Sequence, residues 1–188
     1  MSGEIYLASK SPRRAELLRQ MGLKPLLIDL DLAEYFEQNE AADAIVCSLA
    51  RKKANAGWQS PQRVKMLPVV AADTLVVCNG KLLGKPENPA EAIQMLQSLN
   101  HREHLVFTGV AIIRDEQIKV EFSCTRVQFD LLSSAQIEAY VASGEFIGKA
   151  GAYAIQGKAA QFVRAINGEY SNVVGLPLNL TWRMLANF

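Results

Sequence analysis

Few cysteines and histidines occur in the sequence, and their spacing excludes several kinds of site. Cys47, Cys78 and Cys124 lie far apart, and none belongs to a C-x-x-C pair. Neither a disulfide framework nor a zinc site is therefore expected, and a reduced, cytoplasmic setting is the default. His101 and His104 are close in sequence but have no cysteine or third histidine nearby, so we interpret His104 as a packing or supporting residue.

Long hydrophobic runs and a strong charge of one sign are also missing. The formal net charge is +1, so no overall field recruits nucleic acid or an anionic membrane, and any basic site must be local. No apolar run approaches the roughly 20 residues of a membrane span, and we expect no signal peptide. Without GxSxG, P-loop or GxGxxG motifs, the serine hydrolase, Walker-type ATPase and Rossmann classes lack support.

What is present is a mixture of strand-like and helix-like segments over 188 residues, enough for one large domain or two small lobes. The clearest strand patterns cover residues 67–78, 104–114 and 118–129, and the last two should form an antiparallel hairpin across Asp115-Glu116. Helices are expected over residues 12–22, 41–57, 89–99, 133–144 and 177–187. This mixture predicts a mixed α/β fold rather than a purely parallel wound sheet.

The segment from Leu7 to Arg14, LASKSPRR, has the pattern of a helix start that could receive an anion. Ser11 is a good N-cap, and Pro12 at the next position loses no helical hydrogen bond. Arg13 and Arg14 then put two positive charges in the first turn, where the helix dipole favours negative ones. Amides, hydroxyls and guanidinium groups together could hold a phosphate chain. The alternative is an exposed helix end with solvated arginines.

Asp73 interrupts the apolar strand pattern VVAADTLVV. A carboxylate is costly to bury unless something pairs with it or ligates it. We favour a general base or a metal ligand at a strand edge, because Thr74 adds a second polar group at the same interruption. The alternative is an aspartate at a bulge that caps local amides.

Four further residues are weak signals when each is taken alone. Lys85 lies in a stiff GKP turn that could present its ammonium to a phosphate, although a turn lysine is the plainer interpretation. Lys53 reads as a solvated lysine near a helix end. Glu34 belongs to an acidic segment, residues 31–40, and could ligate a metal. Gln156 in GAYAIQG offers a donor and an acceptor to a nucleobase edge, or lies at the surface of a glycine-rich turn.

Taken together, these motifs are far more specific. LASKSPRR, ADT, GKP, HLVFTGV, GKAGAYAIQG and NVVGLPL occur in this order between Leu7 and Leu178. The set resembles the Maf family of nucleoside triphosphate pyrophosphatases over nearly the whole chain. One branch of that family acts on dTTP and UTP, and another on 7-methyl-GTP. Arg13, Thr74 and Gln156 are similar to the dTTP/UTP branch, since the other branch tends to have tryptophan, glutamine and glutamate there.

The resemblance implies that residues 1–188 form a single nucleotide pyrophosphatase domain. Its mixed α/β fold would be similar to that of the inosine triphosphate pyrophosphatases, with a cleft between two lobes. Members of the family are often dimeric, so a homodimer is expected. The implied substrates are dTTP and UTP, and the implied cofactor is a divalent cation, Mg²⁺ or Mn²⁺.

Carried over by motif, the resemblance also implies roles for individual residues. Asp73 would be the proton acceptor, and Asp73 and Glu34 would hold the metal. The triphosphate and metal site would be lined by Ser9, Arg14, Glu34, Lys53 and Lys85, of which Glu34, Lys53 and Lys85 would join Asp73 in catalysis. Substrate choice would depend on Arg13, Thr74 and Gln156. Two departures stand out: Ala33-Glu34 keeps only the second member of an acidic pair, and Ala71 replaces a common glycine.

Three alternatives remain open. The chain could act on 7-methyl-GTP or another modified nucleotide. It could be a non-enzymatic nucleotide sensor that regulates cell division, since Maf proteins have been associated with septum formation; intact Asp73, Lys85 and Arg14 argue against this. Nucleic-acid binding would depend on Arg13, Arg14 and the basic run 51–53, and the near-neutral charge weakens it.

Overall fold

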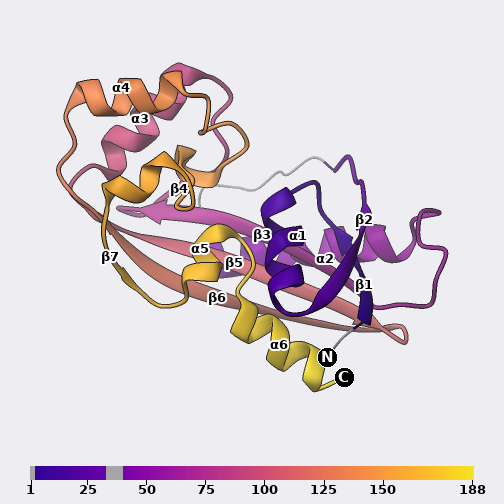
Figure 1. The fold of residues 1–188 in the computed structure, drawn as a ribbon. Helices are drawn as coiled ribbons and strands as arrows, with labels where there is room; N and C mark the ends of the chain where they lie inside the picture. Colours follow the sequence, from indigo (N-terminus) through magenta and orange to yellow (C-terminus); the bar gives the residue numbers. More distant parts are fainter. Residues whose placement is uncertain (1–2, 33–39) are drawn as a thin grey trace.

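A single mixed sheet organises the computed structural model, which describes residues 3–32 and 40–188 (Figure 1). Its seven strands have the order β2-β1-β3-β5-β6-β7, with β4 paired to β3. The strands are β1 (Gly3–Ala8), β2 (Leu23–Ile28), β3 (Val69–Cys78), β4 (Lys81–Leu83), β5 (Glu103–Arg114), β6 (Gln117–Phe129) and β7 (Val163–Asn167). Strands β2, β1 and β3 are parallel, whereas β4, β5, β6 and β7 join antiparallel. The predicted mixed α/β fold is therefore confirmed.

The hairpin expected in the middle of the chain is the longest pairing in the sheet. β5 and β6 pair in continuous register from Arg114↔Gln117 to Glu103↔Gln128. Asp115 and Glu116 make the turn, both with positive φ (48° and 66°). β5 and β6 are the long strands of the sheet, and helices pack on both of its faces.

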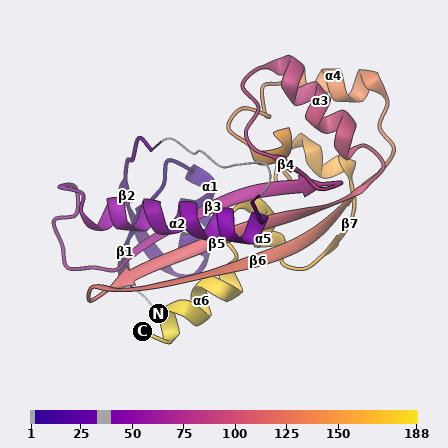
Figure 2. The same ribbon diagram turned by 180° about the vertical axis from the view of Figure 1, so that it is seen from behind.

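Helices cover both faces of the sheet and one end of it. They are α1 (Pro12–Gln20), α2 (Ala42–Trp58), α3 (Pro89–Leu99), α4 (Ser134–Ala142), α5 (Tyr170–Val174) and α6 (Leu178–Ala186), with 3-10 turns η1 (Ala150–Ala152) and η2 (Lys158–Phe162). α2 lies across one face, while α1, α5 and α6 lie on the other (Figures 1 and 2). α3 and α4 gather with β4 at one end of the sheet. None of the helices in the described part of the chain is long and apolar enough to cross a membrane.

Alternation along β3 divides the buried core between the two faces. Val69 and Ala71 belong to the cluster that also contains Ala50 and Ala54 of α2. Val70, Ala72 and Val76 belong to the larger cluster on the opposite face. Because successive side chains of a strand point to opposite faces, Asp73 faces α2 and Thr74 faces α1 and α5.

Two details differ from the expectations. α2 continues to Trp58, so the basic run 51–53 lies within the helix and not at its end. β3 and β5 pair without a bulge from Val69↔Ile113 to Val77↔Leu105, so the bulge interpretation of Asp73 is wrong.

Candidate active site

A cavity of about 550 Å³ opens beside the middle of β3. The strands β1 and β4 pair with the two ends of this edge of β3 and leave its middle unpaired. β1 pairs with β3 only at Val69 and Val70, and β4 pairs with it only at Val76, Val77 and Cys78. In residues 3–32 and 40–188, no strand covers residues 71–75 on this side. Asp73 and Thr74 are therefore reached from an open edge of the sheet, which is the strand edge expected from the sequence.

The cavity gathers eight of the nine residues expected at the site. They are Ser9, Arg13, Arg14, Lys53, Asp73, Thr74, Lys85 and Gln156. They come from the start of α1, from α2, from β3 and from two loops at the other end of the sheet. Glu34 lies outside the described residues.

Arg14 is fixed in place by three hydrogen bonds at the start of α1. It donates from Nε to the Gly175 carbonyl oxygen (2.7 Å), from Nη1 to Ser9 Oγ (3.2 Å) and from Nη2 to Thr74 Oγ1 (3.1 Å). Gly175 has φ of 124°, a left-handed conformation that suits glycine. Arg14 thus ties α1 to β3 and to the end of α5 while keeping its positive charge at the cavity.

Ser9, and not Ser11, makes the side-chain hydrogen bonds at the start of α1. Ser11 occupies the N-cap position of α1, but its side chain makes no capping hydrogen bond. Instead the Ser11 amide donates to Ser9 Oγ (3.2 Å). The expected side-chain cap by Ser11 is therefore wrong. Ser9 therefore joins the helix start to the Arg14 guanidinium.

Two further cations line the cavity close to Arg14. Burial lowers the pKa of Arg13, and the neighbouring Arg14 charge lowers it further. Burial also lowers the pKa of Lys149, with Arg13 as the next cause. Lys149 donates to the Ile147 carbonyl oxygen (2.8 Å). Positive charges that lie close together and are partly removed from water repel one another. A bound anion would relieve this repulsion, so this wall of the cavity favours an anion.

Asp73 forms an ion pair with Lys53 of α2 on one face of the sheet. The side chains are only 7% and 11% exposed, respectively. Lys53 contacts Asp73 Oδ1, and Oδ2 has no hydrogen-bond partner among the described residues. Lys53 is thus no solvated helix-end lysine, because α2 packs against β3 and turns it inward. The pair holds one carboxylate oxygen in place and leaves the second at the cavity.

Two glycine contacts bring α2 close enough to the sheet for this pair to form. A Cβ added to Gly109, which lies opposite Asp73 on β5, would sit 2.3 Å from the Val46 carbonyl oxygen. One added to Gly57 would sit 2.7 Å from Ala8 Cβ. Lys53 lies between these two close approaches along α2. The spacing of helix and sheet therefore depends on positions without a side chain.

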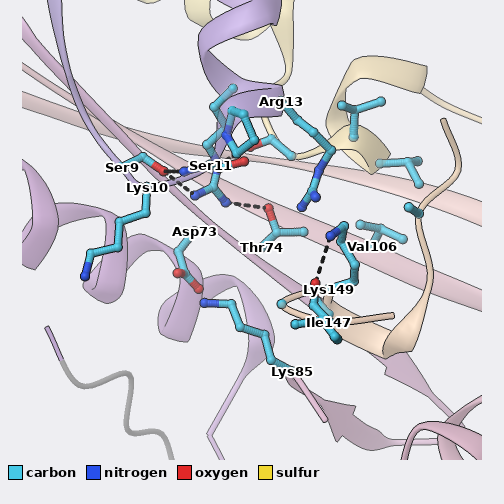
Figure 3. Close-up of a pocket in the computed structure, with 18 of the residues that line it drawn as sticks. Ser9, Lys10, Ser11, Arg13, Asp73, Thr74, Lys85, Val106, Ile147 and Lys149 are labelled. Carbon is cyan, nitrogen blue, oxygen red and sulfur yellow. Dashed lines mark hydrogen bonds between the residues drawn. The ribbon is translucent and has the colours of Figure 1, made fainter. Parts of the chain in front are cut away.

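Lys85 approaches the same carboxylate from the GKP loop. Figure 3 shows its side chain extending with the ammonium toward Asp73. The loop is joined to the glycine-rich segment by the Gly151 amide, which donates to the Gly84 carbonyl oxygen (3.0 Å). Gly151 has φ of 66°, the left-handed region where glycine is favoured. Two loops distant in sequence are thus held together at the cavity.

The loop that carries Gln156 is held by Glu145. Glu145 Oε2 accepts a hydrogen bond from the Lys158 amide (2.8 Å) and lies against Gly157, where an added Cβ would be 2.1 Å away. Gln156 itself is exposed and lines the cavity. Glu145 thereby holds the backbone of Gly157 and Lys158, which directly follow Gln156.

Sequence reasoning missed Lys149 and the buried groups behind Thr74. Lys149 follows Gly148 in a segment already noted for its glycines, and a lysine directly after a glycine was a usable signal, as at Lys85. Thr108 and Asn172 had no local signal, because a threonine in a strand is common and the five-residue helix α5 that carries Asn172 has too little periodicity to be predicted. Their importance comes only from contacts across the fold.

The carboxylates at the cavity are few. In the described part of the chain, no three His, Cys, Asp or Glu side chains cluster as a metal site. Among the described residues, the carboxylates that line the cavity are Asp73 and the exposed Asp31, which is paired with Lys10. Mg²⁺ is commonly held by one or two carboxylates together with substrate phosphates and water, so this donor set fits a cation that arrives with a nucleotide.

The family model and the similar sequences point to one family. The family model described as "Maf-like protein" matches residues 4–188. The chain is similar to a dTTP/UTP pyrophosphatase of Chromobacterium violaceum, with 46% identity over 98% of this chain and 94% of that protein. It is equally similar to a dTTP/UTP pyrophosphatase of Escherichia coli K12, with 46% identity over 98% and 92% of the two chains. Among solved structures, the Staphylococcus aureus Ham1 protein matches 67% of this chain and 71% of its own, with 15% identity and a TM-score of 0.44.

Proposed function

The chain belongs to the Maf family, and from this premise we propose that it hydrolyses dTTP and UTP to the nucleoside monophosphate and pyrophosphate. One observation supports the reaction most strongly. A nearly buried carboxylate, Asp73, lies at an open sheet edge with the cations of Arg14, Lys53 and Lys85 around the same cavity. A carboxylate beside several cations suits a water that must be deprotonated next to a polyanion.

In this proposal Asp73 accepts the proton of the attacking water. Lys53 holds Oδ1, which orients the carboxylate, and Oδ2 would take the proton. Arg14 and Lys85, with Lys149 on the adjoining wall, would attract the triphosphate and stabilise the charge that develops on the leaving pyrophosphate. The water would add to the α-phosphorus while the bond to the β-phosphate oxygen breaks.

We further propose that a divalent cation, Mg²⁺ or Mn²⁺, accompanies the nucleotide. Asp73 would be its ligand from the described residues, and Glu34 is the second candidate. When bound, such a cation neutralises phosphate charge and polarises the phosphoryl group. The chain's own residues would then orient the nucleotide and accept the proton.

Substrate choice is assigned to Arg13, Thr74 and Gln156, which all line the cavity. A site that hydrogen-bonds a base edge rejects bases that leave its polar groups unpaired. Gln156 can both donate and accept, which suits a uracil or thymine edge with a carbonyl beside an N–H.

A nucleotide panel with Mg²⁺ tests the proposal. We expect turnover of dTTP and UTP above that of 7-methyl-GTP, with a monophosphate and pyrophosphate as products. Release of orthophosphate and a diphosphate would contradict the assigned bond. Preference for 7-methyl-GTP would move the chain to the other branch of the family, and no turnover of any nucleotide would favour a nucleotide-sensing regulator.

Four wider expectations are also proposals. We propose a single domain, supported by one sheet that runs through the described residues. We propose a cytoplasmic location, supported by free thiols at Cys47, Cys78 and Cys124. A homodimer and the lack of nucleic-acid binding also stay predictions, to be checked by sedimentation and by DNA titration.

A further inference from the structure

A chain of hydroxyl groups leads from the cavity into the protein behind Thr74. Thr74 Oγ1 lies 3.0 Å from Thr108 Oγ1 on the neighbouring strand β5. Thr108 Oγ1 in turn donates to the main-chain carbonyl oxygen of Asn172 in α5 (3.0 Å). Thr108 and Asn172 are both 0% exposed. No solvent therefore competes for these hydrogen bonds.

Asn172 is held firmly enough to fix the direction of this chain. Its side-chain amide donates to the Val106 carbonyl oxygen (2.9 Å) and to Thr125 Oγ1 (3.0 Å). Both bonds anchor α5 to the β5–β6 hairpin. The carbonyl oxygen of Asn172 thus stays in position to accept from Thr108.

Counting hydrogens determines what the Thr74 hydroxyl can do. A threonine hydroxyl has one hydrogen to donate and two lone pairs to accept with. Thr108 uses its hydrogen on Asn172, so in the bond between the two threonines Thr74 must be the donor. Thr74 also accepts from Arg14 Nη2 (3.1 Å). Its hydrogen is committed, and one lone pair remains.

A hydroxyl in this state can only accept a hydrogen bond from a ligand in the cavity. Phosphate oxygens are themselves acceptors, so Thr74 cannot bind the triphosphate by donation. A uracil or thymine ring carries a donor, N3–H, on its base-pairing edge. Cytosine has a lone pair at the same atom, and it would meet the lone pair of Thr74.

From this geometry we infer that Thr108 is a specificity-determining positioning residue, which makes Thr74 an obligate acceptor for the N3–H of uracil or thymine. The inference rests on the proposed function, because it names the group of that substrate which Thr74 reads. Thr108 acts through Thr74 and does not itself line the cavity.

The test compares kcat/KM for UTP and CTP in matched variants. Thr108→Val removes the hydroxyl at nearly constant shape, which releases the Thr74 hydrogen to turn toward the ligand. We expect the UTP-to-CTP ratio to fall about tenfold, chiefly through a lower KM for CTP, while kcat for UTP changes little. Thr108→Ser keeps the hydroxyl and should restore the ratio.

Thr181→Val is the matched control. Thr181 is also 0% exposed and donates to a main-chain carbonyl oxygen, that of Pro177, but it lies in α6 away from the cavity. It should leave the ratio unchanged even if the protein is less stable. An equal ratio in Thr108→Val and Thr181→Val would overturn the inference. If Thr108→Val does not fold, Thr74→Val provides the comparison, and an unchanged ratio there has the same meaning.

Failure of the proposed function is recognised separately. If the wild-type protein turns over neither UTP nor dTTP, the dissociation constants of UMP and CMP, measured by calorimetry, replace the rates. The inference then requires tighter binding of UMP in the wild type and loss of that preference in Thr108→Val.

Discussion

Lys53 of α2 and Asp73 of β3 form an ion pair at the open edge of the sheet, with both side chains largely buried. The contact joins a helix on one face of the sheet to β3, at the part of the strand that β1 and β4 leave unpaired. It orients the carboxylate proposed as the base, and it makes the base dependent on where α2 sits.

Asp73→Asn should abolish most of the activity. Asparagine cannot take the proton of the attacking water, so we expect kcat to fall roughly 100-fold or more. Binding of dTTP, measured by calorimetry, should survive in part because Arg14 and Lys85 still line the cavity. The unfolding free energy should fall by about 1.5–3 kcal/mol, since Lys53 loses a charged partner. Activity near the wild-type rate in a folded Asp73→Asn protein would assign the base elsewhere, with Glu34 the next candidate.

Gly109→Ala should disturb the same pair from a distance. The added Cβ would meet the Val46 carbonyl oxygen at 2.3 Å, so α2 must move outward. We expect about 1–3 kcal/mol less stability in chemical denaturation and a lower kcat. Gly3→Ala is the control, because an added Cβ there meets nothing within 4 Å. Equal behaviour of the two variants would disprove the proposed spacing.

Ser9→Ala and Ser11→Ala should separate the serine expected at the site from the serine expected to cap the helix. Ser9 accepts from the Ser11 amide and from Arg14, whereas the Ser11 side chain makes no capping bond. We expect kcat/KM for dTTP to fall about tenfold in Ser9→Ala, from the loss of two hydrogen bonds, and much less in Ser11→Ala. A larger effect in Ser11→Ala would restore Ser11 as the functional cap.

Gln156→Glu should alter selectivity more than folding. A carboxylate only accepts hydrogen bonds, so one contact to the base edge is left unpaired, at a cost of about 1–3 kcal/mol in kcat/KM for dTTP and UTP. Gln156 is exposed, so the melting temperature should hardly change. Gln161→Glu, an exposed position outside the cavity, controls for the added charge. Unchanged relative rates across the nucleotide panel would remove Gln156 from the specificity set.

His104 should make the protein less stable as pH falls. Burial lowers its pKa to about 4, so below its ordinary value of 6.5 the unfolded chain binds a proton that the folded protein does not. Stability attributable to His104 is thus complete above pH 6.5 and falls toward pH 4, by about 3 kcal/mol. His104→Phe should remove this part of the slope in denaturation measured from pH 7 to 4. The exposed His101→Gln should not, and identical slopes in all three proteins would contradict the assignment.

Local patterns sufficed for most of the fold. The β5–β6 hairpin, the long helix α2 and the strand around Asp73 all follow from side-chain periodicity and turn residues, which act between near neighbours. The short elements β4 and α5 were not predicted, because three to five residues carry too little periodic signal and their pairing partners are distant. The motif set also indicated eight residues that line one cavity.

Tertiary structure alone decided how those residues work together. Nothing near Lys53 in sequence indicates that it is buried against Asp73, because the contact depends on α2 approaching β5 over Gly109. Nothing near Thr74 indicates that its hydrogen is committed, because Thr108 and Asn172 arrive from other parts of the chain. Residue types and their periodicity are local properties of the sequence. The direction of a hydrogen bond and the partner of a buried charge depend instead on how distant elements pack together.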